Sequence, residues 1–219
     1  MAPTVPSPVM ADDFDGPQAL PLTTDDGVTI DAEMIRAADE RAAAVICHPH
    51  PRMGGDRHNP VVDTLFRALP RHGITTLRLD FRGVGRSTGT YADGIGERRD
   101  ADAALAYFAE HHPGLPLWSV GYSFGGDVAL SVDHPDLAGW VAVAPPLRVL
   151  ADEPPASTSG RPTTLVVPVH DQFSPPERTR SETTAWADTD VVEVPMGDHF
   201  LAGRLDAVAD LVVAAISPA

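Results

Sequence analysis

Apolar and polar positions alternate in patterns that predict strands over much of the chain. Residues 19–23 and 28–35 are two such segments, and the turn sequence Asp25-Asp26-Gly27 between them predicts an antiparallel hairpin. A run that is apolar throughout, such as 42–47, is typical of a strand covered on both faces. Further strands are predicted at residues 74–79, 117–120, 140–144, 164–169 and 191–194.

Apolar residues at helical spacing fill the gaps between these runs. The first predicted helix begins at Asn59-Pro60, a capping residue with proline at the first helical position, and Gly73 closes it. Other helices are predicted around 101–108, from Asp127 to about His134, and over 201–215. Strands that alternate with helices predict an α/β fold, with a mostly parallel central sheet and helices on both faces. The connection 145–162 is too short to hold a cap domain.

The segment Gly121-Tyr122-Ser123-Phe124-Gly125 lies between a predicted strand and a predicted helix, and it matches the G-x-S-x-G nucleophile elbow. A strand that turns at once into a helix forces its turn residue into a strained backbone conformation. The neighbours two positions away must then lack a Cβ atom, as Gly121 and Gly125 do. Ser123 is therefore the candidate nucleophile, exposed at the positive end of the helix. The alternative is a plain glycine-rich turn with a capping serine.

A serine hydroxyl needs a base, and the base needs an acid that orients it. In chains built around this elbow, the acid and then the histidine follow the serine. Asp171 follows the predicted strand 164–169, and His199 follows the predicted strand 191–194. Because the carboxyl ends of parallel strands meet at one edge of a sheet, we expect Ser123, Asp171 and His199 to form a catalytic triad.

Two other carboxylates are alternatives for the acid. Asp152 follows the predicted strand 140–144, and Asp198 directly precedes His199. Neighbouring side chains in an extended segment point to opposite sides, which makes Asp198 a poor partner for the histidine. Asp171 could instead be a turn residue ahead of Pro175-Pro176.

Two backbone N–H groups are expected to form an oxyanion hole. The first is that of Phe124, directly after the candidate nucleophile. The second should come from the loop 48–55, in which two of the first four residues are prolines that carry no N–H. His50 lies between these prolines and is the first choice, and Arg52 and Met53 are the alternatives.

Composition narrows the partners and the location. The formal net charge is −15 and the chain has no lysine, which disfavours nucleic acid and anionic membranes as partners. A single cysteine, Cys47, excludes an internal disulfide and a cysteine-based zinc site. No run approaches the roughly 18–20 apolar residues of a membrane span. Residues 1–17 lack the features of a signal peptide and predict a disordered tail before a single domain at 18–219, so we expect a cytoplasmic protein.

Several dispersed motifs occur in one order along the chain. His-Pro-His-Pro lies at 48–51, a Gly-Gly pair at 54–55, and Arg-Gly-Val-Gly-x-Ser-x-Gly at 82–89; Gly96-Glu97 and Asp198-His199-Phe200 follow. With the elbow, these motifs resemble the α/β-hydrolase superfamily, and more closely its small lidless bacterial hydrolases. The resemblance implies an α/β-hydrolase fold and a Ser-Asp-His hydrolase without organic or metal cofactor. With no cap domain predicted, we expect small acyl esters as substrates, or related thioesters or amides.

Two other functions remain as alternatives. His48, His50, Asp56 and His58 cluster in one segment, and imidazole with carboxylate suits zinc in a metal-dependent hydrolase. Their spacing differs from the tight His-x-His-x-Asp-His of binuclear hydrolases, and His48 is expected to make structural hydrogen bonds. The other alternative is a non-catalytic binding protein on a hydrolase scaffold, which would not need three catalytic groups in the correct order.

Overall fold

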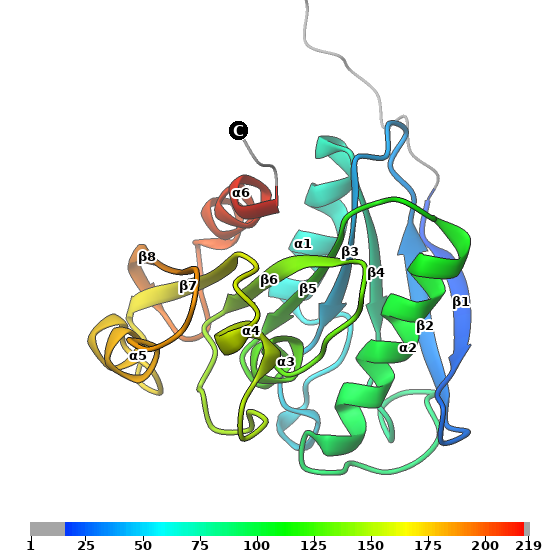
Figure 1. Ribbon diagram of the computed structural model, residues 1–219, viewed down its shortest axis with the longest axis horizontal. Helices are drawn as coiled ribbons and strands as arrows, with labels where there is room; N and C mark the ends of the chain where they lie inside the picture. The colour runs from blue at the N-terminus through cyan, green and yellow to red at the C-terminus, as the bar shows by residue number, and fades with distance from the viewer. Residues whose placement is uncertain (1–15, 217–219) are drawn as a thin grey trace, which may run out of the picture.

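A single eight-stranded sheet, in the order β1-β2-β4-β3-β5-β6-β7-β8, forms the centre of the computed structural model (Figure 1). The structure describes residues 16–216, so residues 1–15 of the predicted tail lie outside it. The strands are β1 (Gln18–Thr23), β2 (Thr29–Ile35), β3 (Ala42–Cys47), β4 (Ile74–Leu79), β5 (Leu117–Tyr122), β6 (Leu137–Val143), β7 (Thr163–His170) and β8 (Thr189–Asp198). The β1–β2 and β2–β4 pairs are antiparallel, and the other five pairs are parallel.

Helices cover both faces of this sheet (Figure 1). On one face lie α1 (Pro60–Ala68) and α6 (Leu205–Ile216), and on the other lie α2 (Ile95–His111) and α3 (Phe124–Leu130). The remaining turns of helix are η1 (Pro51–Met53), η2 (Leu69–His72), α4 (Pro155–Thr158) and α5 (Pro176–Glu182). The predicted α/β class, with a mostly parallel sheet and two helical layers, is therefore confirmed. Between residues 16 and 216, no helix is both long and apolar enough to cross a membrane.

Strand β3 divides the core into two layers. Ala43, Val45 and Cys47 face the layer that contains α2 and α3, whereas Ala44 and Ile46 face the layer that contains α1 and α6. All of these side chains are fully buried, as the uniformly apolar run predicts. Because both faces of β3 are apolar, its parallel pairing with β4 on one side and β5 on the other fixes where its carboxyl end lies.

Two features of the helices differ from the prediction. Helix α3 ends at Leu130, well before His134, because the Ser131 hydroxyl donates to the Asp127 carbonyl oxygen and closes the last turn. Helices α4 and α5 were not predicted: α4 has only 4 residues, and the 7 residues of α5 are all polar or charged apart from Pro176, so neither shows an apolar repeat. The connection 145–162 holds α4 alone among these helices and forms no cap domain.

The motif 82–89 is held by a buried ion pair. The Arg82 guanidinium lies 2.8 Å from Asp100 of α2 and 2.9 Å from Asp26 in the β1–β2 turn. The Asp100 side chain is fully buried, and its burial raises the pKa of the carboxyl despite the nearby guanidinium. Arg82 thus ties three segments together and neutralises a carboxylate that has no contact with water.

Arg82→Met should lower the free energy of unfolding by about 3–5 kcal/mol, because it leaves Asp100 buried without a partner. The matched control is Arg86→Met in the same motif. The Arg86 side chain is 76% exposed, and its ion pair with Asp31 should add little. Urea denaturation of both variants is the measurement. Equal midpoints for the two variants would contradict a stabilising role for the buried pair.

Candidate active site

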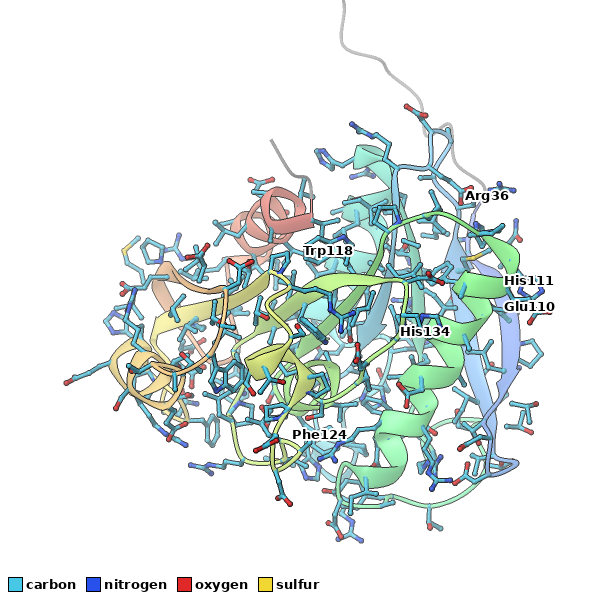
Figure 2. The ribbon with its side chains drawn as sticks, in the orientation of Figure 1. Arg36, Glu110, His111, Trp118, Phe124 and His134 are labelled. Atoms are coloured by element: carbon cyan, nitrogen blue, oxygen red, sulfur yellow. The ribbon has the colours of Figure 1, made fainter. Side chains whose placement is uncertain are left out.

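The chain turns sharply at Ser123, between the end of β5 and the start of α3. Ser123 has φ 54° and ψ −124°, a backbone conformation that residues other than glycine rarely adopt. Its N–H donates to the carbonyl oxygen of Val143 on the neighbouring strand β6 (2.9 Å). In Figure 2, Trp118 lies near the start of β5 and Phe124 lies below its end. The turn is therefore at the carboxyl edge of the sheet, as the elbow prediction requires.

Both glycines of the elbow lie where no Cβ atom would fit. A Cβ on Gly121 would lie 2.0 Å from the carbonyl oxygen of Gly125. A Cβ on Gly125 would lie 2.3 Å from the carbonyl oxygen of Cys47 and 2.4 Å from that of His48. The carbonyl groups that exclude a side chain at Gly125 belong to the end of β3. The absence of a side chain at Gly125 therefore allows the loop after β3 to approach Ser123 closely.

The three residues predicted as a triad lie in hydrogen-bonding contact. Ser123 Oγ lies 3.0 Å from His199 Nε2, and His199 Nδ1 lies 2.8 Å from Asp171 Oδ2. Asp171 Oδ1 accepts from the N–H groups of Phe173 (2.8 Å) and Ser174 (3.1 Å). The carboxylate thus holds the proton of neutral His199 on Nδ1 and leaves the Nε2 lone pair for the serine hydroxyl.

The pairing of the last two strands brings Asp171 beside His199. The β7–β8 ladder is irregular between Pro168 and His170, and it resumes with His170 opposite Asp198. Asp171 and His199 are the first residues after the two strands. Irregularities of this kind re-aim the residues that follow them. Both side chains therefore leave the sheet at the same point.

Neither alternative acid contacts His199. Asp152 is exposed in the loop after β6. Asp198 Oδ1 accepts from the N–H groups of Phe200 and Leu201, both at 3.1 Å, and closes the turn after β8. The prediction that Asp198 points away from the histidine agrees with this geometry.

The expected oxyanion donors also lie near Ser123. The N–H groups of Phe124 and His50 donate no hydrogen bond to any group in the described part of the chain, so both are available to a ligand. The N–H of Arg52 donates to His50 Nδ1 (3.1 Å), and that of Met53 donates to the His50 carbonyl oxygen (3.0 Å). Because these two alternatives are engaged, the geometry favours His50 as the second donor.

The side chains suggested as a metal site, those of His48, His50, Asp56 and His58, do not form one cluster. His48 accepts from the N–H of Phe81 through Nε2 (3.0 Å) and donates to the Pro49 carbonyl through Nδ1 (2.6 Å). Burial lowers the pKa of His48 to about 4, so the ring is neutral and structural. Asp56 accepts from the N–H of His58 (2.8 Å). Residues 16–216 contain no group of three or more His, Cys, Asp or Glu side chains that could hold a metal.

Comparison with known proteins agrees with this arrangement. Residues 38–203 match the model of the family Hydrolase_4, described as serine aminopeptidase, S33. The chain belongs to this family. Its hydrolase fold and the predicted α/β-hydrolase superfamily are thereby confirmed.

Two solved structures are similar over nearly the whole hydrolase. An alpha-beta serine hydrolase homologue from Coxiella burnetii is 30% identical with a TM-score of 0.81, and the match covers 94% of this chain and 98% of that one. XC6422 from Xanthomonas campestris, an a/b serine hydrolase without lid, is 27% identical with a TM-score of 0.80, covering 91% and 93%. The uncharacterized protein RP471 of Rickettsia prowazekii is 36% identical over 110 residues, which are 49% of this chain and 46% of that relative.

Asp127 of the hydrolase has a role that the sequence did not predict. Its buried carboxylate accepts from the N–H groups of Leu147 (2.9 Å), Arg148 (2.8 Å) and Val149 (2.9 Å). Burial raises the pKa of this carboxyl to about 6, although the three hydrogen bonds oppose the shift. Asp127 thereby ties the loop after β6 to the helix that begins beside Ser123. Its partners are backbone groups 20 to 22 residues away, which leave no pattern in the sequence.

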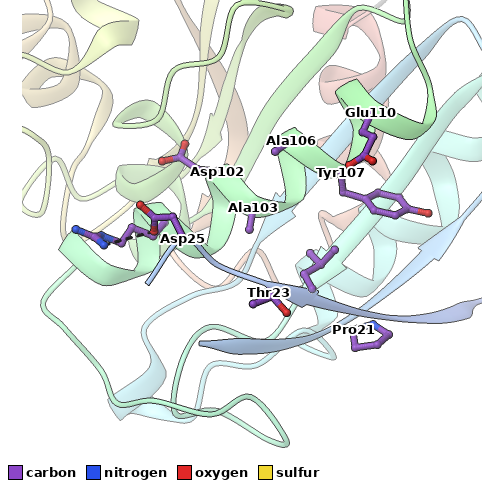
Figure 3. A pocket seen from close by; sticks show the side chains of 10 residues that line it. Pro21, Thr23, Asp25, Asp102, Ala103, Ala106, Tyr107 and Glu110 are labelled. Carbon is purple, nitrogen blue, oxygen red and sulfur yellow. Dashed lines mark hydrogen bonds and ion pairs between the residues drawn. The ribbon is translucent and has the colours of Figure 1, made fainter. Parts of the chain in front are cut away.

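A cleft of about 660 Å³ lies beside Tyr91. It opens between residues 91–98 and 148–152, and its walls combine the apolar side chains of Ile95 and Val149 with charged ones such as Arg98 and Asp152. The Tyr91 ring lies 5.9 Å from the Phe124 ring, which places one wall beside the expected oxyanion hole. A second hollow of about 460 Å³ lies between β1 and α2 and contains none of the predicted site residues (Figure 3).

Gly125→Ala should lower the free energy of unfolding by about 1–3 kcal/mol or more, because the new Cβ would collide with two backbone carbonyls. The matched control is Gly126→Ala, one residue further along α3. A Cβ there would lie 3.3 and 3.4 Å from two side-chain carbons and 3.5 Å from the Gly121 carbonyl oxygen, with none of the sub-3 Å collisions expected at Gly125, and alanine favours the helix. Urea denaturation should place the control near the wild type. Similar losses in both variants would contradict the close-approach argument.

Proposed function

We propose that the hydrolase cleaves small acyl esters, or related thioesters and amides, through an acyl-enzyme intermediate. One observation carries this proposal: Ser123 Oγ lies 3.0 Å from His199 Nε2, and His199 Nδ1 lies 2.8 Å from Asp171 Oδ2. A partly exposed turn serine with this pair of partners has the groups that nucleophilic catalysis needs. Three catalytic groups in order also argue against a non-catalytic binding protein.

The geometry supports a two-step mechanism. In the first step Ser123 Oγ attacks the substrate carbonyl while His199 Nε2 takes its proton, and Asp171 stabilises the imidazolium that forms. The N–H groups of Phe124 and His50 bind the developing oxyanion. His199 then gives the proton to the leaving group, and the acyl group remains on Ser123. In the second step water, activated by His199, releases the acid and restores the serine.

The surroundings of the elbow support substrates of modest size. Within residues 16–216 no cap domain covers the site, and the open cleft of about 660 Å³ beside Tyr91 has both charged and apolar walls. Each buried methylene contributes only about 0.8 kcal/mol, so a short open cleft gives little discrimination in favour of long acyl chains. Short acyl groups are therefore the expected substrates.

The net charge of the chain and the chemistry of the triad indicate which substrates, location and cofactors to expect. The net charge of −15 disfavours nucleic acid, anionic membranes and anionic substrates as partners, and a small neutral molecule fits best. We propose a cytoplasmic enzyme. Its reaction needs no cofactor, because the serine, the histidine and the carboxylate supply the nucleophile and the proton transfers.

Ser123→Ala should abolish ester hydrolysis and leave the fold intact, because the variant loses only one hydroxyl group. Loss of a triad nucleophile costs about 10⁶-fold in kcat. The measurement is kcat/KM for p-nitrophenyl esters from acetate to palmitate, together with labelling by a fluorophosphonate probe. Near-wild-type turnover in a folded variant would refute the serine mechanism.

Asp171→Asn should lower kcat by about 10⁴-fold, because asparagine favours the wrong histidine tautomer. Asp152→Asn is the control: Asp152 is exposed and lies at the wall of the cleft beside Tyr91, so this change should affect KM at most and leave kcat near that of the wild type. Steady-state kinetics of both variants on p-nitrophenyl acetate make the test. If the two variants exchanged behaviour, the acid would be Asp152, although the serine mechanism would stand.

A further inference from the structure

The imidazole of His50 is held at both ring nitrogens. The N–H of Arg52 donates to Nδ1 (3.1 Å), and Nε2 lies 3.2 Å from the hydroxyl oxygen of Tyr91. Nδ1 accepts from an N–H and therefore carries no proton, so the ring is neutral; burial, followed by the charge of Arg52, lowers the pKa of His50 in the same sense. Since Nδ1 accepts, Nε2 carries the proton and donates it to the Tyr91 oxygen. The hydrogen-bond network thus assigns one tautomer and one ring orientation.

Aromatic contacts join the same residues to the elbow. The His50 ring stacks on the Tyr91 ring with a centroid distance of 5.2 Å, and it lies 4.9 Å from the Phe124 ring. The Arg52 guanidinium lies over the Tyr91 ring, 4.6 Å from its centroid. Tyr91 therefore contacts both residues whose N–H groups are expected to bind the oxyanion.

The turn that carries Tyr91 is itself fixed. Glu97, a fully buried residue in the first turn of α2, accepts from the N–H groups of Ala92 (2.9 Å) and Gly94 (2.8 Å). Gly94 has φ 87°, and a Cβ there would lie 2.3 Å from a Val149 methyl carbon. The Gly96-Glu97 motif, which takes no part in the proposed chemistry, thus builds the turn that presents Tyr91 to His50.

We propose that Tyr91 is a positioning residue for the oxyanion-binding N–H of His50, acting through the His50 imidazole. The inference rests on the proposed function, because it assigns His50 its catalytic role. His50 precedes Pro51, which already restricts its backbone to an extended conformation, observed at φ −55° and ψ 120°. The hydroxyl of Tyr91 fixes the ring and thereby the remaining freedom of this residue.

The Tyr91→Phe variant tests this role because it deletes only the hydroxyl group, which accepts from His50 and also interacts with the carboxylate of Asp93. We expect kcat to fall about tenfold while KM changes less than about twofold, because the oxyanion forms only after the serine attacks. The affinity for a trifluoromethyl ketone, which forms an oxyanion on the serine, should fall by the same factor. Thermal unfolding should be unchanged within a few degrees.

The matched control is Tyr107→Phe. Tyr107 lies on α2 at the hollow shown in Figure 3, and its ring also stacks on a histidine, His111, at 4.2 Å. Both tyrosines are half-buried. This variant should keep the kcat, the KM and the inhibitor affinity of the wild type.

A double-mutant cycle with His50→Ala separates an indirect role from a direct one. If Tyr91 acts through the His50 ring, Tyr91→Phe should lower kcat less than about twofold once that ring is removed. An equal loss in both backgrounds, an unchanged kcat in Tyr91→Phe, or a change in KM alone would each overturn the inference. A wild-type protein that hydrolyses no ester and escapes fluorophosphonate labelling would instead overturn the proposed function, and this inference with it.

Discussion

The contact between the backbone of α3 and the end of β3 is the constraint on which the site depends. Gly125 lies against the carbonyl groups of Cys47 and His48 with no room for a side chain. This close approach brings the loop that carries His50 next to the helix that begins at Phe124. His50 and Phe124, which lie more than 70 residues apart in the sequence, are therefore neighbours, with their rings 4.9 Å apart. The strained φ of Ser123 is the local consequence, because only a very tight turn lets the helix start so close to the sheet.

The remaining groups reach the site through strand pairing and buried polar contacts. The last pair of the β7–β8 ladder, His170 opposite Asp198, places Asp171 and His199 next to each other. On the other side, Asp127 holds the loop that follows β6, and Glu97 holds the turn that carries Tyr91. Each of these carboxylates is buried and accepts from two or three backbone N–H groups. The loops around the serine are thus fixed by backbone hydrogen bonds to buried acids, without a covering domain.

The elements that the sequence predicted well are those with a local physical signature. Strand β3 was predictable because burial on both faces demands an unbroken apolar run, and the elbow because its geometry demands glycines at two set positions. The order of Ser123, Asp171 and His199 followed from where strands end. Asp127, Tyr91 and Arg82 were different, because their partners lie far along the chain and a lone polar residue does not reveal them. Helix α5 was missed because, apart from Pro176, its residues are all polar or charged and show no apolar repeat.

Because β8 lies at the edge of the sheet, the site can lose its geometry under conditions in which the rest of the fold is still intact. β8 pairs only with β7, and most of its residues are at least partly exposed. An edge strand of this kind opens locally at a lower free energy than the buried strands β3 and β5. The proposed base, His199, follows directly after β8, so fraying of this one strand would withdraw it from Ser123 while the rest of the sheet stays folded. On gradual heating, catalytic competence would be lost reversibly before the protein melts.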